Sequence, residues 1–290
     1  MKHPFLLRGL LSLAALHLHE ESRSDTERLT YTQLASSHQD AALRGYQEQL
    51  LSIGETNSEA LLLFSAIIAS ISWAFLRHSA DSLYGFTYVD KVVGIFDLLI
   101  GAKAVSIEGK QWIKPGDTAV LAVTPDTQNI MPWPQDANAS LDALLVQVDS
   151  SAQATAQEGI ADASSFGSQA EVITAYKNAI QGIKKLYYCT AQHRPDISMV
   201  FAWPVIIHPL YIQKVKQHDT MALLILAHFG AALHCLHDVW WTKRLGAHLV
   251  QAISQVIDTD WLVYLNWPLS WTRIDHRYHS PGLNALGVEI

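Results

Sequence analysis

Two tryptophan-rich stretches decide how this chain can fold: TMALLILAHFGAALHCLHDVWW at residues 220–241 and WLVYLNWPLSW at residues 261–271. Together with nearby Trp203 they hold six of the nine tryptophans in the chain. Each such side chain can bury about 150 to 250 Å² of surface, either in a filled core or around a cavity for a large apolar molecule. The functional question is therefore whether the space between these residues is filled or hollow.

Apolar and aromatic residues recur every three or four positions along most of the chain, which is the spacing of one helix face. The pattern is clearest from Tyr31 to Ile53 and from Val172 to Tyr187. Pro4 suits the first turn of a helix, where its missing N–H is not needed. The sequence therefore predicts an all-α fold, with one helical, bundle-like domain.

Three predicted helix starts carry a capping box, in which two side chains accept hydrogen bonds from otherwise unpaired amides. The boxes pair Ser24 with Glu27, Thr56 with Glu59 and Ser168 with Glu171. Two segments are predicted to be loops, because residues 114–135 contain four prolines and residues 150–168 are small and polar. Within the first segment, residues 118–123 are a candidate short strand.

Length, cysteine content and charge exclude several classes of protein. A chain of 290 residues can bury about 75% of its unfolded surface and needs no disulfide framework. Its two cysteines, Cys189 and Cys235, fit a reducing cytoplasmic or nuclear compartment and are too few for a six-cysteine zinc cluster. The formal net charge is −7 and there is no basic block, so direct nucleic-acid binding is not expected.

One apolar run, residues 60–76, approaches the length of a membrane span. It contains three serines, and a helix that is hydrophobic all round is equally expected at the centre of a soluble helical protein. Residues 1–18 have the outline of a secretion signal, but Arg8 interrupts their apolar stretch. Both segments are therefore interpreted as core helices, and no membrane span is predicted.

The motif HPFLLRGLLSLAALHL at residues 3–18 resembles the opening of the ligand-sensing half of fungal zinc binuclear cluster regulators, in particular the sterol uptake control protein group. Further segments match in family order, at residues 31–50, 57–69, 221–233, 240–241 and 261–268. The resemblance implies an all-helical ligand-binding domain over residues 1–268, with residues 269–290 as an unassigned tail. It also implies an apolar pocket near the C-terminal helices that holds a sterol-like or other isoprenoid molecule.

Two departures from the family pattern bear on function. In the family a zinc cluster and a linker precede this domain, whereas here the first matching residue is His3, so we expect the DNA-binding module to be absent. After the tryptophan pair the family tends to place an acidic residue and a glycine, but this chain has Thr242 to Leu245 before Gly246. The turn after the tryptophans is therefore expected to differ from that of the family.

The predicted ligand-binding residues are large apolar side chains within or beside the matched segments, and core packing is the alternative for about half of them. They are Trp73, Phe96, Trp203, Phe229, Leu233, Trp240, Trp241 and Trp267. Because Trp203 precedes Pro204, a helix boundary or kink there is expected to present the indole to a cavity.

The candidate catalytic residues are His234, Asp238 and Tyr264. His234 and Asp238 stand four apart in the predicted helix over residues 220–241, so the carboxylate can orient the imidazole; a purely structural histidine is the more common alternative. Tyr264 offers a hydroxyl that can orient a ligand oxygen. There is no phosphate-binding loop, nucleophile elbow, redox motif or metal-ligand pattern, so neither cofactor nor metal is predicted.

Three functions remain open at this point. In the first, which we favour, the pocket folds an isoprenoid or polyketide of fungal secondary metabolism into a reactive conformation and catalyses its cyclisation or isomerisation, because preorganisation alone can lower a barrier by about 7 to 11 kcal/mol. In the second, the chain is a sterol- or lipid-sensing transcriptional regulator without its own DNA-binding domain, acting as a homodimer or paired with a full-length regulator. In the third, it is a fragment of an ordinary regulator.

Overall fold

A computed structural model of the chain describes residues 2–113, 135–158, 168–190, 197–236 and 239–273. These residues form α-helices and short 3₁₀ helices with no strand among them, which confirms the predicted all-α fold. In chain order the elements are α1 (Pro4–Glu21), α2 (Asp25–Leu50), α3 (Ser58–Ser79), η1 (Ala80–Ser82), α4 (Gly85–Gly109), α5 (Gln135–Glu158), α6 (Gln169–Thr190), α7 (Ile197–Ile206), α8 (Pro209–Lys216), α9 (Thr220–His234), α10 (Leu245–Ser254), η3 (Thr259–Leu265) and α11 (Asn266–Arg273).

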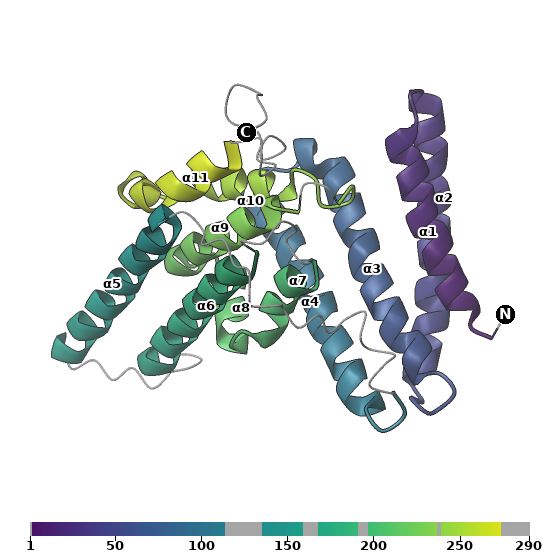
Figure 1. Cartoon of the computed structure of the whole chain (residues 1–290), viewed down its shortest axis with the longest axis horizontal. Helices are drawn as coiled ribbons and strands as arrows, with labels where there is room; N and C mark the ends of the chain where they lie inside the picture. Colours follow the sequence, from purple (N-terminus) through teal and green to yellow (C-terminus); the bar gives the residue numbers. More distant parts are fainter. Residues whose placement is uncertain (1, 114–134, 159–167, 191–196, 237–238, 274–290) are drawn as a thin grey trace, which may run out of the picture.

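The helices form two parts that meet along α3 (Figure 1). On one side, α1 and α2 form an antiparallel hairpin that packs against α3. On the other side, α9 contacts α5, α6, α8, α10 and α11. α4 runs antiparallel to α3, and the short α7 contacts α4 and α6.

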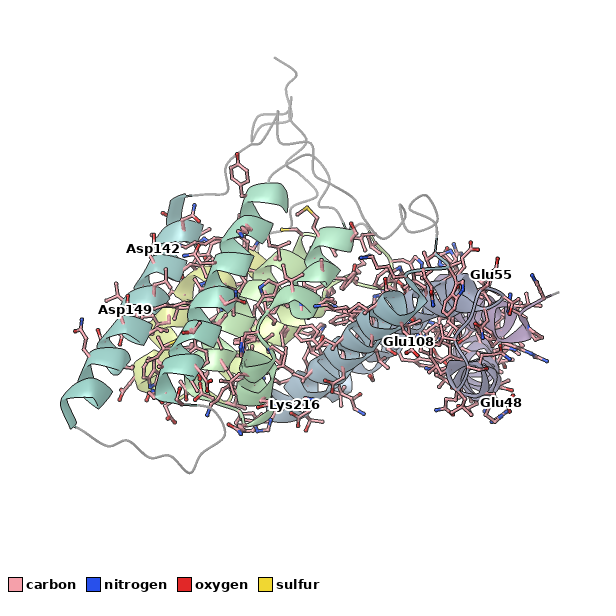
Figure 2. The ribbon with its side chains drawn as sticks, turned by 90° about the horizontal axis from the view of Figure 1, so that it is seen from below. Glu48, Glu55, Glu108, Asp142, Asp149 and Lys216 are labelled. Carbon is pink, nitrogen blue, oxygen red and sulfur yellow. The ribbon has the colours of Figure 1, made fainter. Side chains whose placement is uncertain are left out.

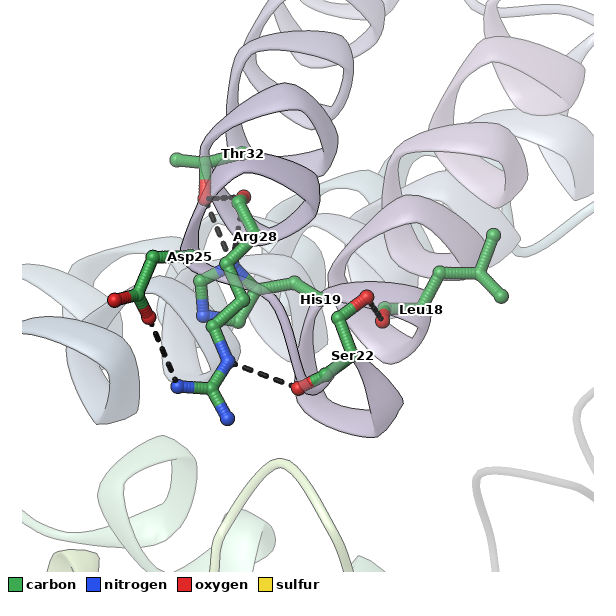
Figure 3. Close-up of polar contacts among 6 residues, drawn as sticks. All are labelled: Leu18, His19, Ser22, Asp25, Arg28 and Thr32. Carbon is green, nitrogen blue, oxygen red and sulfur yellow. Dashed lines mark hydrogen bonds and ion pairs between the residues drawn. The ribbon is translucent and has the colours of Figure 1, made fainter.

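The turn that joins α1 to α2 is fixed by several hydrogen bonds (Figure 3). Arg28 Nε donates to the Ser22 carbonyl at 3.0 Å, and Ser22 Oγ donates to the Leu18 carbonyl at 2.8 Å. His19 Nδ1 lies 3.0 Å from the Arg28 carbonyl and 2.9 Å from Thr32 Oγ1. These bonds satisfy backbone groups at the helix ends, so the hairpin reverses within a few residues.

A first apolar cluster, here called the hairpin cluster, joins α1 and α2 to α3. Gly9 permits the close approach of α1 to α3, because a Cβ at Gly9 would lie 2.7 Å from the Phe64 ring. The buried Ser12 Oγ donates to the Ala35 carbonyl at 2.9 Å and so links α1 to α2. In this cluster Gly9 allows α1 to pack closely on α3, and the buried Ser12 hydroxyl has a hydrogen-bond partner on α2.

A second apolar cluster, here called the central core, surrounds α9. Trp203 stacks on Phe229 with ring centroids 4.8 Å apart, and Phe96 meets the same ring edge-on at 5.2 Å. The backbones of α9 and α10 touch, because a Cβ at Gly246 would lie 2.2 Å from the Gly230 carbonyl oxygen. Such close packing leaves every described residue from Ala222 to Leu233 buried.

Ion pairs also link helices on the outer surface. Lys177 Nζ lies 2.5 Å from an oxygen of Asp149, which ties α6 to α5 (Figure 2). Lys216 Nζ donates to Asp97 at 2.8 Å and ties α8 to α4. Exposed pairs of this kind contribute less than about 1 kcal/mol each, so apolar packing is the main force that holds the helices together.

The predicted loop over residues 150–168 is wrong in its first half, because α5 continues to Glu158. Leu141, Leu144 and Val148 recur at helical spacing and are buried, so they anchor this helix against the core. Alanine and glutamine dominate the residues that follow, and both are good helix formers. Of the predicted loop over residues 114–135, Gln135 is the first residue of α5. Residues 159–167, residues 114–134 and the candidate strand lie outside the described residues.

One of the three predicted capping boxes forms in full, in front of α6. The Ser168 amide donates to Glu171 Oε2 at 2.8 Å, and the Glu171 amide donates to Ser168 Oγ at 3.3 Å. In front of α2, Ser24 occupies the N-cap position but its side chain makes no capping bond. In front of α3 the predicted box is wrong, because Asn57 rather than Thr56 is the N-cap residue.

The two tryptophan-rich stretches are less regular than predicted. α9 ends at His234, so the stretch over residues 220–241 is not one continuous helix. The start of α10 presses on the end of α9, because a Cβ at Gly246 would lie 2.4 Å from the His234 amide nitrogen. The chain must therefore reverse between them, and Arg244 takes a left-handed φ of 67° in that turn. The stretch over residues 261–271 begins as the 3₁₀ helix η3 and continues as α11.

The apolar run of α3 has the length of a membrane span. The segment Ser58–Ser82 is long and apolar enough to cross a membrane by length and composition. However, 61% of its most apolar 18-residue segment is buried inside the protein. A buried core helix can be as long and as apolar as a membrane span. α3 lies between the α1–α2 hairpin and the other helices, where a core helix is expected.

Candidate ligand-binding hollow

A hollow of about 860 Å³ lies where α3, α4 and α7 meet. Trp241, from the turn after α9, completes its wall. Most of the lining side chains are apolar, and many are small. They are Leu62, Ala66, Ala69, Ser70 and Trp73 of α3, Leu99, Ala102, Lys103, Ser106 and Ile107 of α4, and Ile197, Ser198, Phe201, Ala202 and Val205 of α7.

The hollow exists because short side chains line α3 and α4 where they face α7. Ala66, Ala69 and Ser70 follow one another at the spacing of a helix face, and Ala102 and Ser106 do the same on α4. Ala69 is buried but belongs to neither the hairpin cluster nor the central core. The space therefore lies at the seam between the two apolar clusters.

Three aromatic rings in contact form one wall of the hollow. Phe201 lies between the other two, with ring centroids 5.6 Å from Trp73 and 5.5 Å from Trp241. Trp241 packs against both apolar clusters and so bridges them. The indole Nε1 of Trp73 is buried and has no hydrogen-bond partner among the residues that the structure describes. A buried donor without an acceptor costs about 1 to 3 kcal/mol of stability.

The polar groups of the hollow are few. Lys103 Nζ donates to the Val205 carbonyl at 3.1 Å and so bridges α4 and α7. Ser70 Oγ donates to the Ala66 carbonyl of its own helix at 3.2 Å. Lys103 is the ionisable side chain in the described lining, and the hollow has no histidine, cysteine, tyrosine or carboxylate there. In the described part of the chain, no three metal-ligating side chains lie together either.

Two of the predicted ligand-binding residues, Trp73 and Trp241, line this hollow. Two others lie elsewhere. Trp240 packs against the hairpin cluster, with its ring 5.0 Å from that of His17. Trp267 of α11 stacks on His228 at 5.9 Å.

The remaining four predicted residues lie in the central core. Phe96, Phe229 and Leu233 have no exposed surface, and Trp203 has 1%. Pro204 does not end the helix, since it lies inside α7. The Trp203 indole packs over Gly182 and donates its N–H to the Ala179 carbonyl at 3.2 Å. Its edge also borders a second hollow of about 440 Å³, between α6 and α7.

The structure describes two of the three candidate catalytic residues, His234 and Tyr264. His234 is the last residue of α9 and is half-buried. Tyr264 lies in η3, where its ring is 5.7 Å from that of Trp261. Neither lines the hollow between α3, α4 and α7. Asp238, the predicted partner of His234, lies outside the described residues.

A different histidine of α9 is the one that the core encloses. His228 has no exposed surface, and its Nδ1 lies 3.0 Å from the Leu224 carbonyl. Its Nε2 lies 2.9 Å from Ser140 Oγ of α5. Burial lowers the pKa of His228 to about 4, because the apolar surroundings penalise the charged ring. His228 is therefore a neutral side chain that links α5 to α9.

Residues that sequence reasoning did not single out include Lys103, Ser106 and Phe201. Phe201 stands two positions before Trp203 on α7, so the two rings point to different sides of the helix. The sequence feature that could have indicated the hollow is the repeat of alanine and serine along residues 66–70 and 102–106. Such a repeat gives a helix face with short side chains. Whether this face borders a cavity or a closely packed helix depends on which helix lies opposite, and the repeat alone does not show that.

Comparison with known proteins gives one relative. The chain is similar to a Zn(2)-C6 fungal-type transcription factor of Gibberella zeae, with 25% identity over 284 residues. The similarity covers 93% of this chain and 54% of that protein, so the chain spans about half the length of its relative. No family model and no solved structure matches the chain. The comparison supports a relationship to fungal transcription factors, whereas membership of the sterol uptake control group stays a prediction.

Proposed function

We propose that this chain is the ligand-sensing part of a fungal transcriptional regulator, and that the hollow between α3, α4 and α7 binds a large apolar molecule. The observation that carries the proposal is the hollow itself, with its volume of about 860 Å³ and mainly apolar walls. Small-molecule sites are typically concave, mostly apolar and about 300 to 1,000 Å³ in volume. An isoprenoid, a sterol or a polyketide has the apolar surface that such walls require.

The aromatic wall favours an apolar occupant. Phe201 and Trp241 keep exposed apolar surface, which costs about 25 cal/mol for each Å² left in water. A ligand that covers these two rings would remove that surface from water.

The regulatory part of the proposal rests on the similarity to a fungal transcription factor. A ligand between α3, α4 and α7 would alter the contact between Phe201 of α7 and Trp73 of α3, and so change how the two apolar clusters are joined. The 290 residues contain two cysteines, so a six-cysteine zinc cluster would come from another part of the protein or from a partner. A homodimer or a pair with a full-length regulator, acting in the nucleus or cytoplasm, fits this role.

The alternative of a cyclase or isomerase has less support. Within the described lining, an acid–base step would rest on Lys103 alone, and His234 and Tyr264 lie elsewhere. Shape alone can accelerate a cyclisation, but no observation on this hollow distinguishes such a catalyst from a binder. Sensing is therefore the function that the hollow and the relative support together.

The binding part of the proposal can be tested with a substitution that fills the hollow with a larger side chain. Ala102→Phe adds a ring inside the hollow, whereas Ala104→Phe adds the same ring to an exposed position of α4. The purified proteins are extracted with organic solvent for mass spectrometry and then titrated with farnesol and ergosterol, with tryptophan fluorescence as readout. We expect Ala102→Phe to lose any bound molecule and to bind the probes at least tenfold more weakly, while Ala104→Phe behaves as the parent. Equal behaviour of the two variants would count against the hollow as the site.

The regulatory part needs a second readout. The whole chain is fused to an unrelated DNA-binding domain, and a reporter gene is followed with and without the molecule identified by extraction. We expect the reporter to respond for the parent and for Ala104→Phe but not for Ala102→Phe. A constant reporter despite binding would argue against sensing, and conversion of the molecule into a single new product would favour the cyclase instead.

A further inference from the structure

One positively charged side chain, that of Lys103, lies in the described wall of the hollow. Lys103 shares a helix face with Leu99, Ser106 and Ile107, which also line the hollow, because residues three or four apart lie together. Its Nζ donates to the Val205 carbonyl at 3.1 Å. None of the ion pairs formed by the described residues includes Lys103. Lys103 is exposed to solvent, and its ammonium is held in place without an ion-pair partner among these residues.

The bond to Val205 explains the position of the ammonium but uses only part of its capacity. Val205 lies in the last turn of α7, where free carbonyls and the negative end of the helix dipole attract a lysine. An ammonium has three N–H donors, so two remain for water or for a bound molecule. A carboxylate is the partner that forms the stronger, charge-assisted hydrogen bond with an ammonium. Ser106, one turn further along α4, adds a hydroxyl at the same end of the hollow.

The aromatic wall lies within one helical turn of the cation along α7. Lys103 Nζ bonds to the Val205 carbonyl, and Phe201 precedes Val205 by four residues, which is about 6 Å along the helix. Phe201 in turn meets Trp73 with ring centroids 5.6 Å apart. The hollow therefore has a cationic wall with an aromatic wall beside it.

We propose that the occupant of the hollow is a monocarboxylic acid with an extended apolar body. This inference rests on the ligand-binding function proposed above. The carboxylate accepts hydrogen bonds from Lys103 and Ser106, and the apolar body reaches toward Trp73, Phe201 and Trp241. A single lysine matches one carboxylate, whereas a diphosphate carries more charge than one ammonium offsets. A fully neutral molecule would leave these two donors to the solvent.

The test compares two probes that differ in the head group alone, farnesoic acid and farnesol. Both are titrated into the full chain and into Lys103→Met, Lys103→Arg and Lys91→Met, with tryptophan fluorescence as readout. Lys91→Met is the matched control, because Lys91 is exposed on α4 and does not line the hollow. We expect the parent and Lys91→Met to bind the acid at least tenfold more tightly than the alcohol. Lys103→Met should lose this preference and Lys103→Arg should keep most of it.

The outcomes separate this inference from the proposed function. If the acid and the alcohol bind the parent equally well, or if Lys103→Met keeps the preference, the carboxylate inference is wrong while the hollow remains a binding site. If neither probe binds and extraction yields no apolar molecule, both proposals fail. Thermal unfolding of Lys103→Met and Lys103→Arg shows whether the fold is intact, and a folded Lys103→Met that binds only the alcohol as before supports the inference.

Discussion

The central core around α9 and the hollow beside α3 are built from the same kinds of side chain but packed differently. In the core, Trp203 stacks on Phe229 at 4.8 Å, and both rings are buried. At the hollow, Phe201 and Trp241 stack at 5.5 Å, yet both are only half-buried and about 860 Å³ of space lies beside them. An abundance of aromatic residues therefore does not distinguish a filled core from a cavity.

Backbone spacing and the length of the facing side chains make the difference. Gly230 and Gly246 let α9 and α10 touch, so the side chains between them interlock. On α3, Ala66 and Ala69 are also small, but among the described residues they border the hollow rather than a closely packed helix. Small residues thus close one region and open the other, depending on what stands opposite.

The largest expected contrast between the two regions comes from removing one ring in each. Phe229→Ala should lower the free energy of unfolding by about 3 to 5 kcal/mol, because it leaves a cavity in a packed core. Phe201→Ala should cost about 1 kcal/mol, since its ring is only half removed from water. Urea denaturation of both variants measures the difference. Similar losses would mean that the wall of the hollow is packed as tightly as the core.

A second contrast uses glycine. Gly246→Ala should lower the free energy of unfolding by about 3 kcal/mol, because its Cβ would lie 2.2 Å from the Gly230 carbonyl oxygen and the helices must move apart. Gly94→Ala of α4 is the control, since a Cβ there meets nothing within 4 Å. It should stabilise the protein by about 0.5 to 1 kcal/mol, as expected for alanine in a helix. If both variants are equally stable, α9 and α10 do not approach as described.

Much of the fold could be predicted from the sequence, because the spacing of apolar residues within one segment is enough to identify a helix and its buried face. Val172, Ile180, Ile183 and Tyr187, for example, recur at helical spacing and are all buried in α6. Helix ends were harder to predict. Where α9 stops depends on α10 pressing against it, which is a contact between segments and leaves little trace in local composition.

The site could be predicted only in part, because size was the criterion for choosing its residues. Trp73 and Trp241 line the hollow, whereas Trp203 and Phe229 fill the core, and all four satisfy that criterion. Lys103 could not be found in this way, since an exposed lysine on a helix is ordinary. Its place in the wall of the hollow depends on its contact with α7, which is distant in sequence.

Acid should weaken the central core more than the hollow, because the core buries His228. Its pKa of about 4 in the folded protein lies below its usual value of 6.5, so the unfolded chain binds the proton more tightly. Stability is therefore complete above pH 6.5 and falls as the pH drops toward 4, by about 1.4 kcal/mol per pH unit or about 2 kcal/mol at pH 5. His228→Gln should flatten the slope between pH 7 and 5 in denaturation experiments. An unchanged slope in this variant would assign the acid sensitivity to other groups.

The smallest expected effect on stability comes from adding a side chain to the hollow. Ala66→Leu places a larger apolar group on the face of α3 that borders the hollow, so the free energy of unfolding should change by less than about 0.5 kcal/mol or rise slightly. Ala232→Leu makes the same change in α9, where the alanine is fully buried, and overpacking there should cost about 1 to 3 kcal/mol. Thermal and urea unfolding of the pair measure the contrast directly. A loss at Ala66 as large as that at Ala232 would mean that the seam between the two clusters is already filled, because only an open space accepts three extra carbon atoms without rearrangement.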